Sequence, residues 1–501
     1  MWYTNVCDTE KRTCNSYLEN SSYHSILEKG MKIIEPNEVT NHQNVTAPKD
    51  ADTIGVILMK GDPKQAILRL SGPIIVAMLL MSTYNIVNAI WVAGLGSDAL
   101  AAVGFITPLF MILIGLGIGL GAGVNSTISR RIGAGDRAGA NLAAVNAMIL
   151  TVVISVLLSI ILILFIEPIM QLFGAGETTA LAVTYGRIVF FGTIFILFNN
   201  ITYAILRAEG DTTRAMYVMG ASSVLNIILD PLLIYTAGLG IAGAAWGMII
   251  SLIVVTVILL YWFLVKKDTY ISFSWDLRAA DTKTLRDILS VGLPASLEFF
   301  LMALLAIIIN SMLVIVSGTD AVAVYTAGWR VVYFAIIPII AIATSVISVA
   351  GAAYGGHALE KLPVIHTFSI TLGIIIAIII SVLTWLLADY IALLFTYSSE
   401  SAHLAPSIAA FLGIMCFFYP FVPPGIMSGS LFQGIGKGMT SLCINLLRNL
   451  VFIAVFAYLF GFVLGIGEHG IWWGVVAGDI IGGLVGFSWA RIYISRLLKY
   501  Q

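Results

Sequence analysis

Residues 71–94 read SGPIIVAMLLMSTYNIVNAIWVAG, a run with no acidic and no basic side chain. An α-helix needs about 20 mostly apolar residues to cross a bilayer, and in lipid its backbone polar groups must be satisfied within the segment. This run therefore predicts a transmembrane helix. Eleven similar runs follow, at residues 106–128, 141–165, 186–206, 214–235, 242–265, 294–317, 326–350, 364–387, 407–431, 441–463 and 471–494.

The composition of the 501-residue chain favours the same class. Hydrophobic residues make up 59% of it and charged residues only 11%, whereas a soluble globular chain carries about 25% charged residues. The net charge of −1 offers no basic surface for nucleic acid. No P-loop and no zinc-like Cys/His spacing occurs in the sequence. We therefore expect an all-α membrane protein of twelve transmembrane helices that is not an enzyme and is not driven directly by ATP.

Basic side chains gather in every second loop between the predicted spans. They include Arg130, Arg131, Arg137, Arg207, Arg214, Lys266, Lys267, Lys361, Lys437, Arg496 and Lys499. The positive-inside rule assigns such loops to the cytoplasm, and with an even number of spans both termini lie there. Residues 1–60 are polar and predict a disordered cytoplasmic tail, in which Cys7 and Cys14 give only a weak signal for a disulfide or a metal.

The two halves of the chain repeat one another. Leu70–Pro73 opens the first span and Val291–Pro294 the seventh, while Gly243–Gly247 and Gly470–Gly474 open the sixth and the twelfth. Corresponding positions lie about 221 to 227 residues apart. We therefore expect two pseudo-symmetric six-helix lobes with the same orientation in the membrane. Their boundaries are a first lobe at 61–265, a linker at 266–290 and a second lobe at 291–501.

Several short stretches occur in an order and spacing that is specific in combination. They are Gly61–Pro63, Tyr84–Gly96, Arg130–Ala134, Phe198–Asn200, Leu206–Asp211, Leu225–Pro231, Gly351–Gly355 and Leu431–Gly436. Through them the chain resembles the multidrug and toxic compound extrusion (MATE) family, particularly its archaeal DinF-like branch, from about residue 60 to the C-terminus. The resemblance implies a MATE-like fold and an antiporter. Such a protein uses a proton or sodium gradient to expel organic cations and other amphipathic compounds through a V-shaped cavity between its lobes.

Asp230 is the leading candidate for the coupling site. A charge inside a span is costly, so such a residue is a functional candidate by default. Asn226 lies one turn earlier on the same face, and the two side chains offer oxygen atoms suited to Na⁺, while Asp230 alone could bind a proton. The alternative is a structural carboxylate paired with a helix end or an arginine.

The first span supplies Tyr84 and Asn88, which share one helix face, and Pro73, which could act as a conformational hinge. In the archaeal members that the chain resembles, an aspartate matches Asn88 and a threonine matches Met248. Two of the family's cation ligands are therefore absent here. Asn88 cannot take up a proton, which leaves Asp230 as the titratable member and leaves the choice between H⁺ and Na⁺ open.

Glu298 lies four residues after Pro294 in the seventh span. It resembles approximately the seventh-span glutamate of the NorM-like branch, which implies a role in cation coupling or in binding cationic substrate. A structural carboxylate near the cytoplasmic edge is the alternative, because such side chains can extend to the interface.

Other polar residues within spans are weaker candidates. Asn199 and Asn310 could contact the substrate cavity or simply form hydrogen bonds between helices. Arg448 is expected to have a structural role, either pairing with an acid or reaching a lipid headgroup, and Asp479 is a minor functional candidate.

The predicted function is secondary active export of amphipathic, cationic compounds in exchange for H⁺ or Na⁺, from a monomer surrounded by the lipids of the cell membrane. The runner-up is a flippase for lipids or lipid-linked oligosaccharides. A flippase predicts a strongly basic cavity, and the spans contain few Arg and Lys residues. We expect no cofactor beyond the coupling ion and no nucleic-acid partner.

Overall fold

The computed structural model describes residues 52–273, 281–396 and 402–499, and these form helices and connecting turns without a β-strand. The first-half helices are α2 (Ile54–Lys60), α3 (Pro63–Ala93), α4 (Ser97–Gly133), α5 (Arg137–Leu172), α6 (Thr179–Phe191), α7 (Thr193–Ala208), α8 (Thr212–Pro231) and α9 (Ile241–Leu260). The second-half helices are α10 (Thr282–Ser317), α11 (Thr319–Gly355), α12 (Lys361–Phe395), α13 (Ala405–Met415), α14 (Val422–Gly434), α15 (Gly438–Asn445), α16 (Ile453–Tyr458) and α17 (Glu468–Lys499). Wider π-helical turns extend α8 (Leu232–Thr236) and α9 (Tyr261–Lys266), join α15 to α16 (η7, Leu446–Phe452) and extend α16 (Leu459–Val463).

The predicted all-α membrane fold is confirmed. Within the described ranges, eleven helical segments are long and apolar enough to cross a membrane, and one bent helix pair brings the number to twelve. The bent pair is the predicted fourth span. It breaks by 46° between α6 and α7, at Gly192.

The break at Gly192 has a local cause. The carbonyl of Phe190 accepts hydrogen bonds from the hydroxyls of Ser159 and Thr193, each at 2.7 Å. A Cβ on Gly192 would lie 1.9 Å from Cδ1 of Ile249 on α9. The glycine therefore lets the bent span approach α9, while two hydroxyls satisfy a carbonyl beside the bend.

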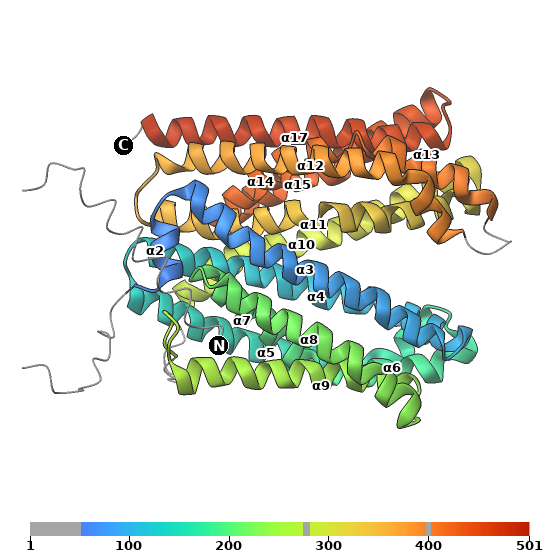
Figure 1. Ribbon diagram of the computed structural model, residues 1–501, viewed down its shortest axis with the longest axis horizontal. Coiled ribbons are helices and arrows are strands. Elements are labelled where there is room, and N and C mark those ends of the chain that lie inside the picture. The colour runs from blue at the N-terminus through green and yellow to red at the C-terminus, as the bar shows by residue number, and fades with distance from the viewer. Residues whose placement is uncertain (1–51, 274–280, 397–401, 500–501) are drawn as a thin grey trace, which may run out of the picture. The chain divides into compact units, whose positions relative to one another are not determined.

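The two lobes meet along α4 of the first lobe. This helix packs against α10, α11 and α14, and α3 packs against α11 (Figure 1). The glycine-rich segment that begins at Gly115 sets the separation, because a Cβ on Gly123 would lie 2.3 Å from the carbonyl oxygen of Ile288. Further along α4, a Cβ on Gly133 would lie 2.0 Å from the carbonyl oxygen of Ala352. Small residues here allow helix backbones to touch, as is common in membrane proteins.

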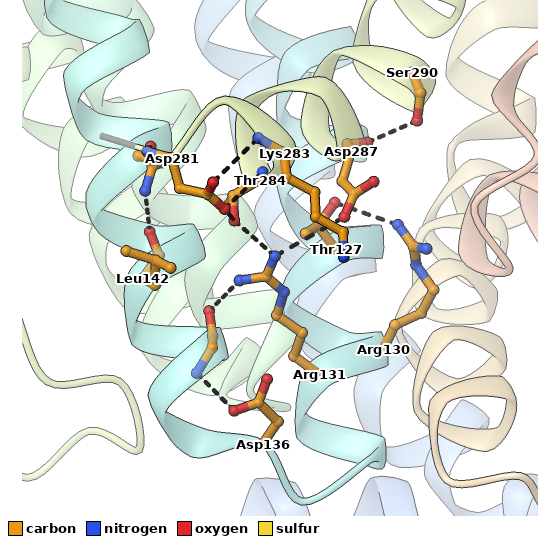
Figure 2. Close-up of polar contacts among 12 residues, drawn as sticks. Thr127, Arg130, Arg131, Asp136, Leu142, Asp281, Lys283, Thr284, Asp287 and Ser290 are labelled. Atoms are coloured by element: carbon orange, nitrogen blue, oxygen red, sulfur yellow. Dashed lines mark hydrogen bonds and ion pairs between the residues drawn. The ribbon is translucent and has the colours of Figure 1, made fainter. Parts of the chain in front are cut away.

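Polar contacts reinforce this junction at one end of the helices. We call this end, where Arg130 and Arg131 lie in the last turn of α4, the basic end. The Arg131 guanidinium donates to the Gly139 carbonyl at 2.6 Å and to Oγ1 of Thr284 in the second lobe at 2.8 Å (Figure 2). Its Nη2 lies 3.9 Å from the Asp287 carboxylate. Arg131, in the last turn of α4, thus joins the first turn of α5 to the first turns of α10.

Two boundaries differ from the sequence-based expectation. Residues 54–60, expected within the polar tail, form α2, which buries Val56 and Met59. The linker is shorter than expected because α10 begins at Thr282, where the carboxylate of Asp281 accepts hydrogen bonds from the backbone N–H groups of Lys283 and Thr284. Residues 1–51, including Cys7 and Cys14, lie outside the described residues.

Candidate functional site

Asp230 lies near the end of α8 and is completely buried. Pro231 follows it, lacks a backbone N–H group and precedes the wider turn at Leu232–Thr236. The local sequence therefore places a carboxylate where the regular hydrogen-bond ladder of the helix changes. A buried carboxylate at such a position requires polar partners.

Two asparagines supply partners for Asp230. Nδ2 of Asn88, on α3, lies 2.6 Å from Oδ2 of Asp230. Asn226 precedes Asp230 by one turn on α8. With its amide nitrogen turned toward the carboxylate, it donates to Oδ1 at 2.7 Å and to Oδ2 at 3.1 Å. In that orientation, which the hydrogen-bond network assigns, its oxygen accepts from the Tyr84 hydroxyl at 3.2 Å. The structure thus brings together Tyr84, Asn88, Asn226 and Asp230.

Gly247, on α9, completes the surroundings of Asp230. A Cβ at this position would lie 2.4 Å from Oδ1 of Asp230, so a larger residue would displace the carboxylate. Met248, at the position where the resemblance implies a cation-ligating threonine, is the next residue along α9. Nothing in the sequence distinguishes Gly247, because a glycine among apolar residues does not indicate which side chain it faces.

As a candidate Na⁺ site, this cluster offers one carboxylate and amide groups. In the arrangement described, Asn88 and Asn226 direct N–H groups toward Asp230, whereas Na⁺, like other hard cations, takes oxygen ligands. The described residues contain no group of three or more His, Cys, Asp or Glu side chains placed to hold a metal ion.

Glu298 forms a second polar cluster, in the other lobe. This half-buried carboxylate of α10 accepts from the Ser441 hydroxyl at 2.9 Å and faces the Gln433 amide nitrogen, which lies 3.3 Å from each carboxylate oxygen. Asn445, one turn after Ser441 on α15, donates to the Ser441 hydroxyl at 3.4 Å. The four-residue spacing of Ser441 and Asn445 was visible in the sequence, but their target was not.

A buried ion pair lies in the same lobe. Nε of Arg448, in η7, is 3.4 Å from Oδ1 of Asp479 on α17, and the two side chains are only 8% and 1% exposed. Gly425 and Gly482 lie against the Arg448 side chain and leave room for it. Of the two structural roles expected for Arg448, pairing with an acid is the one that the structure shows.

The other predicted site residues have different surroundings. Asn199 donates to the Leu252 carbonyl at 3.1 Å and accepts from the Thr256 hydroxyl at 3.1 Å, so its amide joins α7 to α9. The side-chain oxygen of Asn310, on α10, is buried and has no hydrogen-bond partner within the described structure. Pro73 lies within a continuous α3, and two residues before it the Ser71 hydroxyl lies 3.1 Å from the Ser345 hydroxyl of the second lobe.

Two helical lobes, each with a carboxylate among its membrane-spanning segments, are typical of a multi-pass membrane transporter. The model of the MatE family matches the chain twice, over residues 73–232 and 294–459, which correspond to the two lobes. The chain therefore belongs to the MatE family.

Relatives and solved structures agree with this assignment. The chain is 27% identical over 442 residues to the multidrug export protein MepA of Staphylococcus saprophyticus, covering 86% of this chain and 94% of the relative. It is 41% identical to a multidrug resistance MATE family transporter of the MOP superfamily solved in an outward-facing conformation, with a TM-score of 0.87 over 90% of this chain and 100% of that one. The chain is also 40% identical to a MOP superfamily transporter from Pyrococcus furiosus, with a TM-score of 0.86 over 89% of this chain and 99% of that one. The reverse polarity of that transporter's binding pocket is said to suggest a different function.

Proposed function

We propose that this protein is a secondary active exporter of amphipathic, cationic compounds, driven by the inward movement of H⁺. The observation that carries the proposal is Asp230, completely buried and held by amide groups of α3 and α8. A carboxylate in this setting can bind either a proton or an organic cation, and one site that binds both in turn can exchange one for the other.

The second carboxylate supports the same function. Glu298 is held by Ser441 and Gln433 in the second lobe, so each lobe offers one acidic site. We assign cation coupling or the binding of cationic substrate to Glu298. Asn199 and Asn310 are weaker candidates for substrate contacts, and Asn310 is the better one because its amide oxygen lacks a partner within the described structure.

The N–H donors around Asp230 count against Na⁺ as the coupling ion. Asn88 stands where related archaeal members carry an aspartate, and it directs an N–H group toward Asp230. A Na⁺ ion between Asp230 and Asn226 would require the Asn226 amide to turn its oxygen inward, away from the Tyr84 hydroxyl. A proton on Asp230 requires no oxygen ligand from either amide, although it weakens the bonds that Asn88 and Asn226 donate to the charged carboxylate.

The proposed mechanism uses Asn88 as the link to the first span. Protonation of Asp230 removes the charge that holds the Asn88 amide, since a hydrogen bond to a charged group is stronger than one to a neutral group. The part of α3 beyond Pro73 is then free to repack, because the proline removes one backbone hydrogen bond at that turn. This repacking releases the substrate outward. We place the protein in the cell membrane as a monomer, with both termini in the cytoplasm.

An efflux assay tests the proposal. Cells that lack their own pumps are loaded with ethidium, and efflux is followed while the proton and sodium gradients are collapsed separately. We expect efflux to stop when the proton gradient is collapsed, and we expect Asp230→Asn to abolish it. Efflux that stops only when the sodium gradient is collapsed would identify Na⁺, and not H⁺, as the coupling ion. Full-rate export by Asp230→Asn would refute the role of Asp230.

A further inference from the structure

Gln433 contacts both the Glu298 carboxylate and the opposite lobe. Its amide nitrogen lies 3.3 Å from both oxygens of Glu298 and 3.2 Å from the Ser441 hydroxyl. Its backbone carbonyl accepts a hydrogen bond from the Ser126 hydroxyl of α4, in the first lobe, at 2.5 Å. One buried residue therefore touches the acidic site of the second lobe and the junction between the lobes.

The bond from Ser126 is well placed to hold the lobes together. Gln433 and Gly434 are the last two residues of α14. The last four carbonyl groups of an α-helix lack hydrogen-bond donors within that helix. The Ser126 hydroxyl is completely buried and also lies 3.1 Å from the Gly434 carbonyl. Ser126 thus adds a donor from the first lobe to the Gln433 carbonyl, which also accepts from the backbone N–H of Gly436 at 3.0 Å.

The surroundings leave little room for adjustment. A Cβ on Gly434 would lie 2.7 Å from the Ile347 carbonyl, and one on Gly351 would lie 2.1 Å from the Ser129 hydroxyl. Because α4, α11 and α14 are already in backbone contact, the bond from Ser126 to Gln433 breaks by separation of the lobes rather than by local sliding.

We propose that Gln433 is a positioning residue that transmits the charge state of Glu298 to the contact between the lobes, with Ser126 as its partner in the first lobe. Ionised Glu298 holds the Gln433 side chain and keeps the lobes closed at the basic end. Loss of that charge through protonation frees the side chain and weakens the bond to Ser126. The basic end then opens.

The direction fits an exporter. Neutralisation of Glu298 in the state closed at the basic end favours opening toward the cytoplasm, so an entering proton returns the empty transporter inward. The charged group that faces Glu298 is Arg448, whose charge is balanced by Asp479 at 3.4 Å. This inference rests on the proposed role of Glu298 as a coupling residue.

Spin-label distances test the inference on the full-length chain. Cys7, Cys14, Cys416 and Cys443 are replaced by Ala, and labels are placed at Ala138 and Glu360, which are exposed and belong to different lobes. We expect acidification to increase the population with a long distance, and Glu298→Gln to produce that population at every pH. The expected change in the ratio of the two populations is about fivefold or more.

Two variants then test the transmission through Gln433, which we call the relay, separately from the coupling role of Glu298. Gln433→Met, which keeps side-chain length, should abolish the pH response, and adding Glu298→Gln to it should change nothing more. Ser126→Ala should favour the long distance at every pH, whereas the control Ser155→Ala, whose buried hydroxyl donates within α5 to the Val152 carbonyl at 3.0 Å, should behave like the parent. Elution as a single species in detergent verifies that each variant is folded.

The outcomes are distinguishable. If Glu298→Gln abolishes the pH response but Gln433→Met retains it, the relay is refuted and the coupling role of Glu298 stands. If Glu298→Gln itself retains both the pH response and full ethidium export, the proposed role of Glu298 fails, and the relay fails with it.

Discussion

The amide nitrogen of Asn88 lies 2.6 Å from Oδ2 of Asp230, so a side chain that cannot ionise joins the first span to the buried carboxylate of α8. A hydrogen bond to a charged group contributes about 1.5–3 kcal/mol, which corresponds to roughly tenfold or more in an equilibrium. We therefore predict that Asn88→Leu lowers ethidium export at a saturating gradient by about tenfold. Asn85→Leu, at an exposed position on the same helix, is the control and should retain the parental rate. Equal rates for the two variants would contradict a role for the Asn88 amide.

Gly247 provides a test that leaves the polar groups of the site unchanged. A Cβ there would lie 2.4 Å from Oδ1 of Asp230, which forces the carboxylate away from α9 and from its amide partners. We predict that Gly247→Ala lowers export by about tenfold, the scale of one lost charged hydrogen bond, while the protein remains folded. The comparison is Gly104→Ala in α4, where an added Cβ meets no atom within 4 Å. Normal export by Gly247→Ala would show that Asp230 tolerates displacement.

The spans and the repeat could be predicted from sequence because the bilayer imposes a length and a composition on every crossing helix. The bend at Gly192 could not, because it depends on Ile249 and Ser159, which are distant in the sequence. Helix α2 at residues 54–60 could not be predicted either, because a helix of seven residues has no recognisable period of its own, and burial of Val56 and Met59 stabilises it.

The candidate site was predictable in part. Asn226 and Asp230 share a helix face by their spacing alone, and the cost of a charge within a span marks Asp230 and Glu298. Their partners come from other helices, however. Gly247 and Gln433 have no distinguishing pattern in the sequence, because their importance arises from packing between elements.

The pair of Arg448 and Asp479 predicts a non-additive effect on stability. Removing one member of a buried ion pair leaves an uncompensated charge, which costs about 3–5 kcal/mol, whereas replacing both by apolar residues is often neutral. We expect Arg448→Met alone to lower the thermal stability in detergent strongly, and Arg448→Met with Asp479→Leu to recover most of the loss. Thermal unfolding followed by size-exclusion chromatography measures both. A double variant as unstable as the sum of the two single variants would show that the residues act independently.

Glu209, at the end of α7, predicts a pH dependence of stability. Its side chain is 1% exposed, Oε2 accepts from the backbone N–H of Ile271 at 3.0 Å, and Oε1 is buried without a hydrogen-bond partner within the described structure. Burial raises the pKa of this carboxyl to about 8, against an ordinary value of 4.5, and the neighbouring Asp211 acts in the same direction, while Arg214 and the Ile271 N–H act against it.

The sign follows from the raised pKa. Between pH 4.5 and about 8 the unfolded chain releases the proton while the folded protein retains it. The free energy of unfolding therefore falls as pH rises through this window, by about 1.4 kcal/mol per pH unit. Glu209→Gln keeps an acceptor for Ile271 and carries no titrating proton, so its Tm relative to the parent should rise from pH 5 to pH 8. Glu360→Gln, at an exposed position, should show no such trend. A Tm difference for Glu209→Gln that stays constant over this range would mean that Glu209 is already ionised at pH 5.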